Sequence, residues 1–157
     1  MTTTGGATAE SLKAIPIFSG CSPEELSAIA SSLEPVEVEA GGVIFREGDP
    51  GEDMYMIASG QVRVVSDVQT EKVVFAHLGP GEFFGEIALF DDEPRTHDAW
   101  AESAVTLWHL SQAELAALLA EQPAWWRHFG RLLTQKIRAS FTAVEDLVLL
   151  APRARLA

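Results

Sequence analysis

A single arginine stands within the acidic stretch "FGEIALFDDEPRTHDAWA", residues 84–101. The planar guanidinium of Arg95 can hold two oxygens of an anion, and the hydroxyl of Thr96 beside it can add a hydrogen bond. The carboxylate of Glu86 accepts hydrogen bonds, which suits sugar hydroxyls rather than phosphate. Together these side chains have the chemistry to bind a sugar phosphate ester.

Backbone groups can add to such a site. Gly85 precedes a short apolar segment, residues 87–90, which is predicted to form one helical turn. The first turn of a helix exposes N–H groups without an internal partner, and these attract an anion. The simpler alternative for Arg95 is a surface ion pair with the carboxylates of residues 91–93, which would contribute little. Composition favours this alternative, and spacing alone does not decide between the two.

The elements that must position these residues are mostly strands. Between residues 35 and 110 the apolar residues alternate with polar ones, and glycine-containing turns interrupt the pattern at short intervals. Runs rich in valine, isoleucine and aromatic residues predict the short antiparallel strands of a small Greek-key or jelly-roll barrel. The predicted strands are residues 36–40, 43–47, 54–58, 61–66, 73–78 and 104–110.

Two helices are predicted before the barrel. The apolar spacing of residues 11–18 indicates a short one. The second begins at Ser22, with Glu25 three residues later as in a capping box and Pro23 at the first helical position. Residues 1–9 are rich in threonine and glycine and have almost nothing to bury, so they are predicted to be a disordered tail.

Helical spacing returns after residue 110. Ser111 and Glu114 repeat the capping arrangement, and Pro123 is expected to open a last helix, residues 123–151. Its small or apolar residues, in alternating steps of three and four, are Gly130, Leu133, Ile137, Ser140, Val144, Leu147 and Ala151. Such a seam predicts a coiled-coil-like contact in a homodimer. The alternative is a helix that packs only on its own barrel.

Composition limits the function further. The chain has 157 residues, 47% of them hydrophobic, which suits one domain with an appendage. Its net charge of -12 argues against direct binding of nucleic acid by these residues, because phosphate neutralisation needs a basic face. The single cysteine, Cys21, excludes an intramolecular disulfide and favours a reducing, cytoplasmic location. No apolar run approaches the roughly 18 to 20 residues of a membrane helix.

Two strings, "FREGDPGEDMYMIASGQVRVV" and "LGPGEFFGEIALFDDEPRTHDAWA", resemble the cyclic nucleotide-binding domain family. The resemblance is strongest to the effector domain of Crp/Fnr-type transcription regulators, and it runs from about Leu12 to the C-terminus. It implies a jelly-roll or double-stranded β-helix barrel closed by helices. It also implies cyclic AMP, or cyclic GMP, as an allosteric ligand. From the residues themselves we expect no required cofactor, no metal site, no catalytic residue and no membrane partner.

Transferred to this chain, the family pattern assigns roles to the cassette, residues 85–96. Glu86 would bind the ribose 2'-hydroxyl, while Arg95 and Thr96 would bind the phosphate. The backbone amides of Ile87 and Ala88 would assist, and Gly85 would let the backbone approach the ribose.

The resemblance also implies that Lys136 and Ser140 of the last helix reach the base across a dimer. Ser140 belongs to the predicted seam as well, whose interface residues are Leu133, Ile137, Ser140, Val144 and Leu147. The chain departs from the family pattern at His97, Asp98 and Phe141. Aspartate facing the phosphate would repel it, and Phe141 stands where the family's type member has a polar residue that contacts adenine.

The implied organisation is a tail at 1–9, a barrel domain at 10–122, a dimerisation helix at 123–151 and the start of a hinge at 152–157. Pro152 is expected to break the helix there. The hinge would lead to a DNA-binding helix-turn-helix half absent from this chain. Two alternatives stay open: a sensor of the same family for haem, a redox signal or another metabolite, and a stand-alone module acting on a protein partner.

Overall fold

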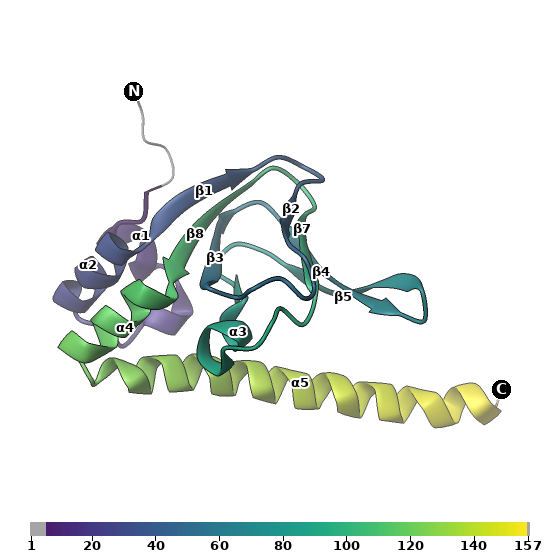
Figure 1. The fold of residues 1–157 in the computed structure, drawn as a ribbon. Coiled ribbons are helices and arrows are strands. Elements are labelled where there is room, and N and C mark those ends of the chain that lie inside the picture. Colours follow the sequence, from purple (N-terminus) through teal and green to yellow (C-terminus); the bar gives the residue numbers. More distant parts are fainter. Residues whose placement is uncertain (1–5, 157) are drawn as a thin grey trace. The chain divides into compact units, whose positions relative to one another are not determined.

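The computed structural model describes residues 6–156, and the side chains of residues 6–149. The chain forms two compact units, Met1–Leu118 and Leu119–Ala157. The boundary falls inside α4 (Gln112–Glu121). The first unit contains the sheets and the N-terminal helices, and the second contains the long helix α5 (Trp125–Leu156) (Figure 1).

Within residues 6–118 the strands form two four-stranded antiparallel sheets, in the orders β1-β8-β3-β6 and β2-β7-β4-β5. Their bounds are β1 (Glu34–Val38), β2 (Val43–Phe45), β3 (Asp53–Ser59), β4 (Val62–Val68), β5 (Glu71–Leu78), β6 (Phe83–Phe84), β7 (Asp98–Ala101) and β8 (Val105–Ser111). This confirms the predicted mainly-β, jelly-roll-like fold with flanking helices. The strands β6 and β7 were not among the predicted runs because both are short, and β7 begins with aspartate, which is depleted in strands.

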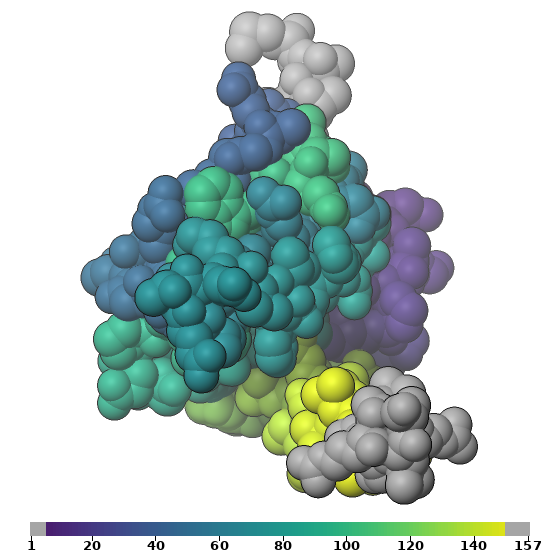
Figure 2. All heavy atoms as spheres, turned by 90° about the vertical axis from the view of Figure 1, so that its right-hand side faces the viewer, coloured from purple at the N-terminus to yellow at the C-terminus, as the bar shows by residue number. Residues whose placement is uncertain are grey.

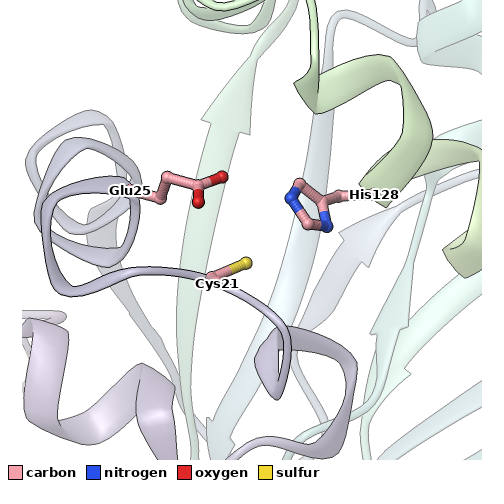
Figure 3. Close-up of side chains that lie close together, drawn as sticks. All are labelled: Cys21, Glu25 and His128. Atoms are coloured by element: carbon pink, nitrogen blue, oxygen red, sulfur yellow. The ribbon is translucent and has the colours of Figure 1, made fainter.

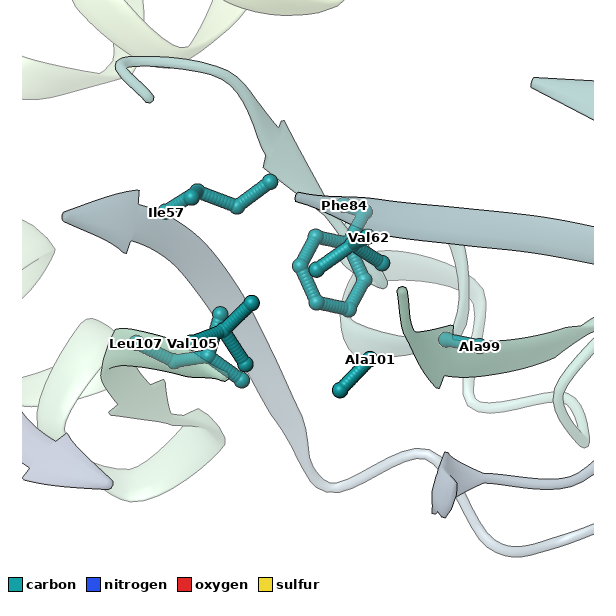
Figure 4. Packing of buried hydrophobic residues seen from close by; sticks show 7 residues of the cluster. All are labelled: Ile57, Val62, Phe84, Ala99, Ala101, Val105 and Leu107. Atoms are coloured by element: carbon teal, nitrogen blue, oxygen red, sulfur yellow. The ribbon is translucent and has the colours of Figure 1, made fainter. Parts of the chain in front are cut away.

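The hydrophobic core lies between the two sheets. Figure 4 shows seven buried members, which come from both sheets: Ile57, Val62, Phe84, Ala99, Ala101, Val105 and Leu107. On β7 and β8 the core members stand two residues apart, Ala99 with Ala101 and Val105 with Leu107, as the predicted two-residue period requires. Burial of each larger apolar side chain contributes about 1.5–3 kcal/mol, so this core gives the cassette a rigid support.

The chain is ordered earlier than predicted. Thr8 caps α1 (Ala9–Lys13), since its Oγ1 accepts a hydrogen bond from the Ser11 amide at 3.1 Å. The prediction of a disordered tail is therefore wrong at residues 8 and 9. Residues 1–5 of the predicted tail lie outside the described chain. The missed signal is the capping pair of Thr8 and Ser11. The helix predicted within residues 11–18 is divided into α1 and a 3₁₀ turn, η1 (Pro16–Phe18), because proline cannot continue the α-helical hydrogen bonds.

The predicted capping box of α2 (Pro23–Ser32) is confirmed. Ser22 Oγ accepts a hydrogen bond from the Glu25 amide at 3.2 Å, and Glu25 Oε1 accepts one from the Ser22 amide at 3.1 Å. Figure 3 shows Glu25 projecting from this helix and Cys21 on the segment that leads into it. Leu26 is buried on the apolar face of the helix.

The C-terminal helices differ from prediction at their ends. Ser111 Oγ accepts a hydrogen bond from the Glu114 amide at 3.1 Å, as predicted. Pro123 lies in the turn before α5 rather than in its first position, and its carbonyl accepts a hydrogen bond from Trp126. The helix continues past Pro152 to Leu156, so the expected break is not present. Proline removes one backbone donor and its ring crowds the preceding turn, yet the residues on both sides of it belong to the same helix. No helix in the described chain has the long uncharged apolar stretch that a membrane crossing requires.

Candidate functional site

The predicted helical turn of the cassette is α3 (Glu86–Asp91), which lies between β6 and β7. Gly85 precedes it with a φ of 82°, a left-handed conformation that glycine adopts without strain. No side chain caps the start of α3. The first amides of the helix, which have no intrahelical partner, are therefore not covered by a capping side chain.

Arg95 is buried, with 5% of its surface exposed. Its Nη1 donates to the carbonyl of Gly85 at 2.7 Å, and its Nη2 donates to the carbonyl of Asp53 at 2.6 Å. The guanidinium also lies over the ring of Phe45, 4.1 Å from its centroid. The alternative of a surface ion pair is wrong, because the side chain is held inside the unit by backbone oxygens.

The charge of Arg95 is only partly compensated by the described residues. Burial lowers the pKa of Arg95, while the nearby groups Tyr55, Asp53, Asp49 and Glu86 act in the opposite direction. Arginine nevertheless stays protonated in proteins. Its Nε is buried and has no hydrogen-bond partner among the described residues. A buried cation with an unused donor is costly unless an anion accompanies it, so the site favours an anionic ligand.

The turn between β2 and β3 holds the cassette through its backbone. The Arg95 amide donates to the carbonyl of Asp49 at 2.9 Å, and the Gly48 amide donates to the carbonyl of Arg95 at 2.9 Å. Asp49 Oδ2 in turn accepts a hydrogen bond from the Arg46 amide at 3.0 Å. The two motifs that carried the family resemblance are thus joined in space. These partners could not be predicted from the sequence. Every residue has a backbone carbonyl, so the type of residue does not show which carbonyl accepts a hydrogen bond.

Gly51 is a second supporting residue that sequence reasoning missed. A Cβ placed on it would lie 2.0 Å from the Cβ of Ala88 and 3.5 Å from Cδ of Arg95. Only a hydrogen atom fits between this turn and α3. Gly51 therefore sets the distance between the turn and the two cassette residues.

The predicted site residues differ in exposure. Glu86 and Ala88 are buried, whereas 51% of Ile87 is exposed. Thr96 is exposed, and its Oγ1 lies 2.8 Å from Nδ1 of His97. The structure thus brings Gly85, Ala88 and Arg95 together around Gly51, and it places Thr96 at the surface.

Asp98, which the sequence suggested could repel a phosphate, has its charge compensated. Its Oδ1 accepts a hydrogen bond from the Glu47 amide at 2.7 Å, and its Oδ2 lies 3.1 Å from Nζ of Lys72. Burial raises the pKa of Asp98, but the hydrogen bonds from Glu47 and Lys72 outweigh it, so that the pKa lies below its ordinary value. Asp98 therefore links β7 to β5 and to the turn that follows β2.

The ion pair of Asp98 with Lys72 predicts that the stability of the fold depends on pH. A carboxyl group with a lowered pKa stabilises the fold above its unfolded-state pKa and loses that contribution as the pH falls through the folded-state value. We expect Asp98→Asn to be less stable than the wild type at about pH 6, with the difference shrinking towards about pH 3. Thermal unfolding followed by circular dichroism at several pH values measures this. A difference that stays constant over the range would contradict it.

The residues predicted on the last helix belong to the second unit. Ser140 Oγ donates to the carbonyl of Lys136 at 2.9 Å, one helical turn earlier. Within the predicted seam, Ile137, Val144 and Leu147 are exposed in the single chain, and Leu133 is half-buried. Contact of Lys136 and Ser140 with a ligand, and pairing of the seam, stay predictions.

Comparison with known proteins agrees with this site. The family model for the cyclic nucleotide-binding domain matches residues 35–122, which include both sheets and the cassette. A CRP-like cAMP-activated global transcriptional regulator of Mycobacterium tuberculosis is 29% identical over 133 residues, 84% of this chain and 59% of that protein. The acetyltransferase Pat of Mycolicibacterium smegmatis is 32% identical over 136 residues, 87% of this chain and 40% of that protein.

Comparison with solved structures leads to the same family. A crystal structure of a cyclic nucleotide-binding domain from Methylobacillus flagellatus superposes with a TM-score of 0.80 at 27% identity, covering 93% of this chain and 86% of that one. The chain spans less than two thirds of the length of the two curated relatives named above. The chain belongs to the cyclic nucleotide-binding domain family.

Proposed function

We propose that this chain is a regulatory domain that binds cyclic AMP and passes the binding event to an output domain. The observation that carries the proposal is the buried Arg95, held by two backbone carbonyls and with an unused Nε. A cyclic nucleotide offers a single negative charge of the size that a guanidinium can hold. The cAMP-activated regulator named above supports the choice of cyclic AMP over cyclic GMP.

The proposed ligand position follows from the cassette. Arg95 and the Thr96 hydroxyl bind the phosphate, with the amides of Ile87 and Ala88 at the uncapped start of α3. The buried carboxylate of Glu86 accepts a hydrogen bond from the ribose 2'-hydroxyl. Lys136 and Ser140 contact the base in this proposal.

Calorimetric titration tests the ligand directly. The purified chain is titrated with cyclic AMP, cyclic GMP and, as a control of the same base without the ring phosphate, 5'-AMP. We expect micromolar or tighter binding of cyclic AMP and much weaker binding of 5'-AMP, because no ring fixes its phosphate relative to the ribose and its second charge would have to be desolvated. A well-folded chain that binds neither cyclic nucleotide would refute the proposal and favour a sensor for another effector.

The proposal includes a homodimer formed through the exposed seam of α5. The side chains of Val144 and Leu147 are exposed and apolar, and a sustained three-four spacing is typical of paired helices. We expect Leu147→Glu to shift the chain from dimer to monomer in sedimentation velocity, because it introduces a charge into an apolar contact.

The control for this experiment is Thr142→Glu, which adds the same charge on α5 away from the seam. Thr142 is exposed and its Oγ1 donates to the carbonyl of Arg138. It should leave the dimer unchanged. A wild-type chain that sediments as a monomer at all concentrations, or an equal effect of both variants, would refute pairing through this seam.

The output that we propose is DNA binding through a further C-terminal domain. In this proposal the chain itself catalyses no reaction. It acts in the reducing cytoplasm, which its single cysteine favours. For such coupling to operate, cyclic AMP must bind one arrangement of the whole protein better than the other. A second candidate is control of an attached enzyme, which the similarity to the acetyltransferase Pat supports. Whether the natural gene encodes further residues, and which kind of domain they form, distinguishes the two.

A further inference from the structure

The Thr96 hydroxyl is already in contact with a neighbouring side chain. Its Oγ1 lies 2.8 Å from Nδ1 of His97, close enough for a hydrogen bond. The His97 ring in turn packs against the ring of Phe75 on β5, with ring centroids 4.8 Å apart and planes at 35°. The ring that contacts Thr96 is thus itself held by a neighbouring strand.

An irregularity in the sheet places Phe75 there. The pairing of β4 with β5 passes from Val64–Ala76 to Val65–Val74, so Phe75 is skipped. A bulge of this kind leaves one residue unpaired and redirects its side chain. Phe75 is 70% exposed, on the hairpin whose tip faces the viewer in Figure 2. Core packing therefore does not explain an aromatic residue at this position.

We propose that His97 is a positioning residue of the phosphate site, which controls whether the Thr96 hydroxyl can donate a hydrogen bond to the anion. This inference rests on the proposed function. If Nδ1 carries no hydrogen, the hydroxyl of Thr96 donates to it and leaves only oxygen lone pairs for the phosphate. If Nδ1 carries a hydrogen, the ring donates to Thr96 Oγ1 and the hydroxyl is free to donate to the phosphate.

Protonation of the ring always produces the favourable arrangement. An imidazolium carries a hydrogen on both nitrogens, so His97 in that state must act as the donor to Thr96. The affinity for a cyclic nucleotide should therefore rise as the pH falls, and the effect should require the Thr96 hydroxyl.

The other charged groups around His97 keep their charge in this pH range. Arg95 stays protonated. Asp98, the next residue along the chain, is ionised and paired with Lys72 of β5, whose pKa is raised by its hydrogen bonds to Asp98 and Asp67. A cyclic phosphate diester carries one negative charge through the neutral range. Since histidine is the side chain that ordinarily titrates between about pH 5 and 8, a change in affinity there reports histidine.

The test is calorimetric titration with cyclic AMP at about pH 6 and about pH 8, within the range of histidine. His97→Phe keeps an aromatic ring against Phe75 and removes Nδ1. We expect the wild type to bind more tightly at the lower pH. At the higher pH the variant should bind up to about tenfold more tightly than the wild type, the effect of one hydrogen bond to a charged group, because no ring nitrogen then accepts the Thr96 hydroxyl. The variant should have lost most of the pH dependence.

The control is His77→Phe, the same substitution on β5 at an exposed histidine that contacts Glu102. It should keep the wild-type affinities at both pH values. Adding His97→Phe to Thr96→Val should change the affinity little at either pH, because the imidazole acts through the hydroxyl that Thr96→Val has removed.

The experiment distinguishes failure of the positioning role from failure of the proposed function. If the wild type binds cyclic AMP, but His97→Phe retains its pH dependence or its effect adds fully to that of Thr96→Val, then the positioning role is wrong while the proposed function stands. If the wild type binds no cyclic nucleotide, the proposed function fails and this inference fails with it.

Discussion

Arg95→Met is expected to weaken cyclic AMP binding by about 100-fold or more, since hydrogen bonds to a charged group contribute about 1.5–3 kcal/mol each and a phosphate can accept two from one guanidinium. The methionine removes the buried charge that the site presents to the ligand, and its apolar chain can still cover the ring of Phe45. Isothermal calorimetry measures the change in affinity. Arg95→Lys should recover only part of it, because an ammonium cannot reproduce the planar fork.

The control for this prediction is Arg46→Met. Arg46 is exposed, and its guanidinium lies over the ring of Trp100 at 5.1 Å rather than beside α3. It tests whether the loss of any positive charge near the turn weakens binding. If Arg46→Met and Arg95→Met reduce the affinity equally, the ligand is held by general electrostatic attraction and the assigned phosphate site is wrong.

Gly51→Ala is expected to destabilise the first unit and to weaken ligand binding together. The added methyl group would overlap the Cβ of Ala88, which belongs to the backbone-fixed start of α3 and cannot rotate away. Either α3 or the turn must move, and overpacking of this kind costs about 1–3 kcal/mol. Movement of α3 also displaces the amides proposed for the phosphate. Thermal unfolding with and without cyclic AMP measures both effects, because a ligand that binds the folded state raises the unfolding temperature by an amount that grows with the logarithm of the ratio of its concentration to its Kd.

A matched control is Gly79→Ala in the same unit. There the added Cβ would meet only the end of the Gln61 side chain, at 3.2 Å from Nε2, and this flexible group can move aside. We expect Gly79→Ala to cause the smaller change in unfolding temperature and to keep the ligand-induced increase. Equal stability of Gly51→Ala and the wild type would show that α3 is free to shift, and the supporting role of the turn would be refuted.

Local features of this chain could be predicted from residue order. The capping box at Ser22 and the side-chain cap at Ser111 depend on residues three apart, and the two-residue alternation identified most strands. The cassette was predictable for the same reason, because Gly85, Glu86 and the start of α3 are contiguous. The errors are also local: Thr8 was not recognised as a cap, and Pro152 was expected to end a helix that continues.

The order of the residues is thus enough to predict the fold class, the place of the cassette and the residue types that can bind an anion. Three features could be seen only in the folded chain: Arg95 is buried and donates to the carbonyls of Gly85 and Asp53, Gly51 contacts α3, and a bulge directs Phe75 to His97. These contacts join distant segments of the chain. They depend on backbone carbonyl oxygens, on the absence of a side chain at a glycine, and on the register in which two strands pair. None of these is encoded in the type or spacing of neighbouring residues.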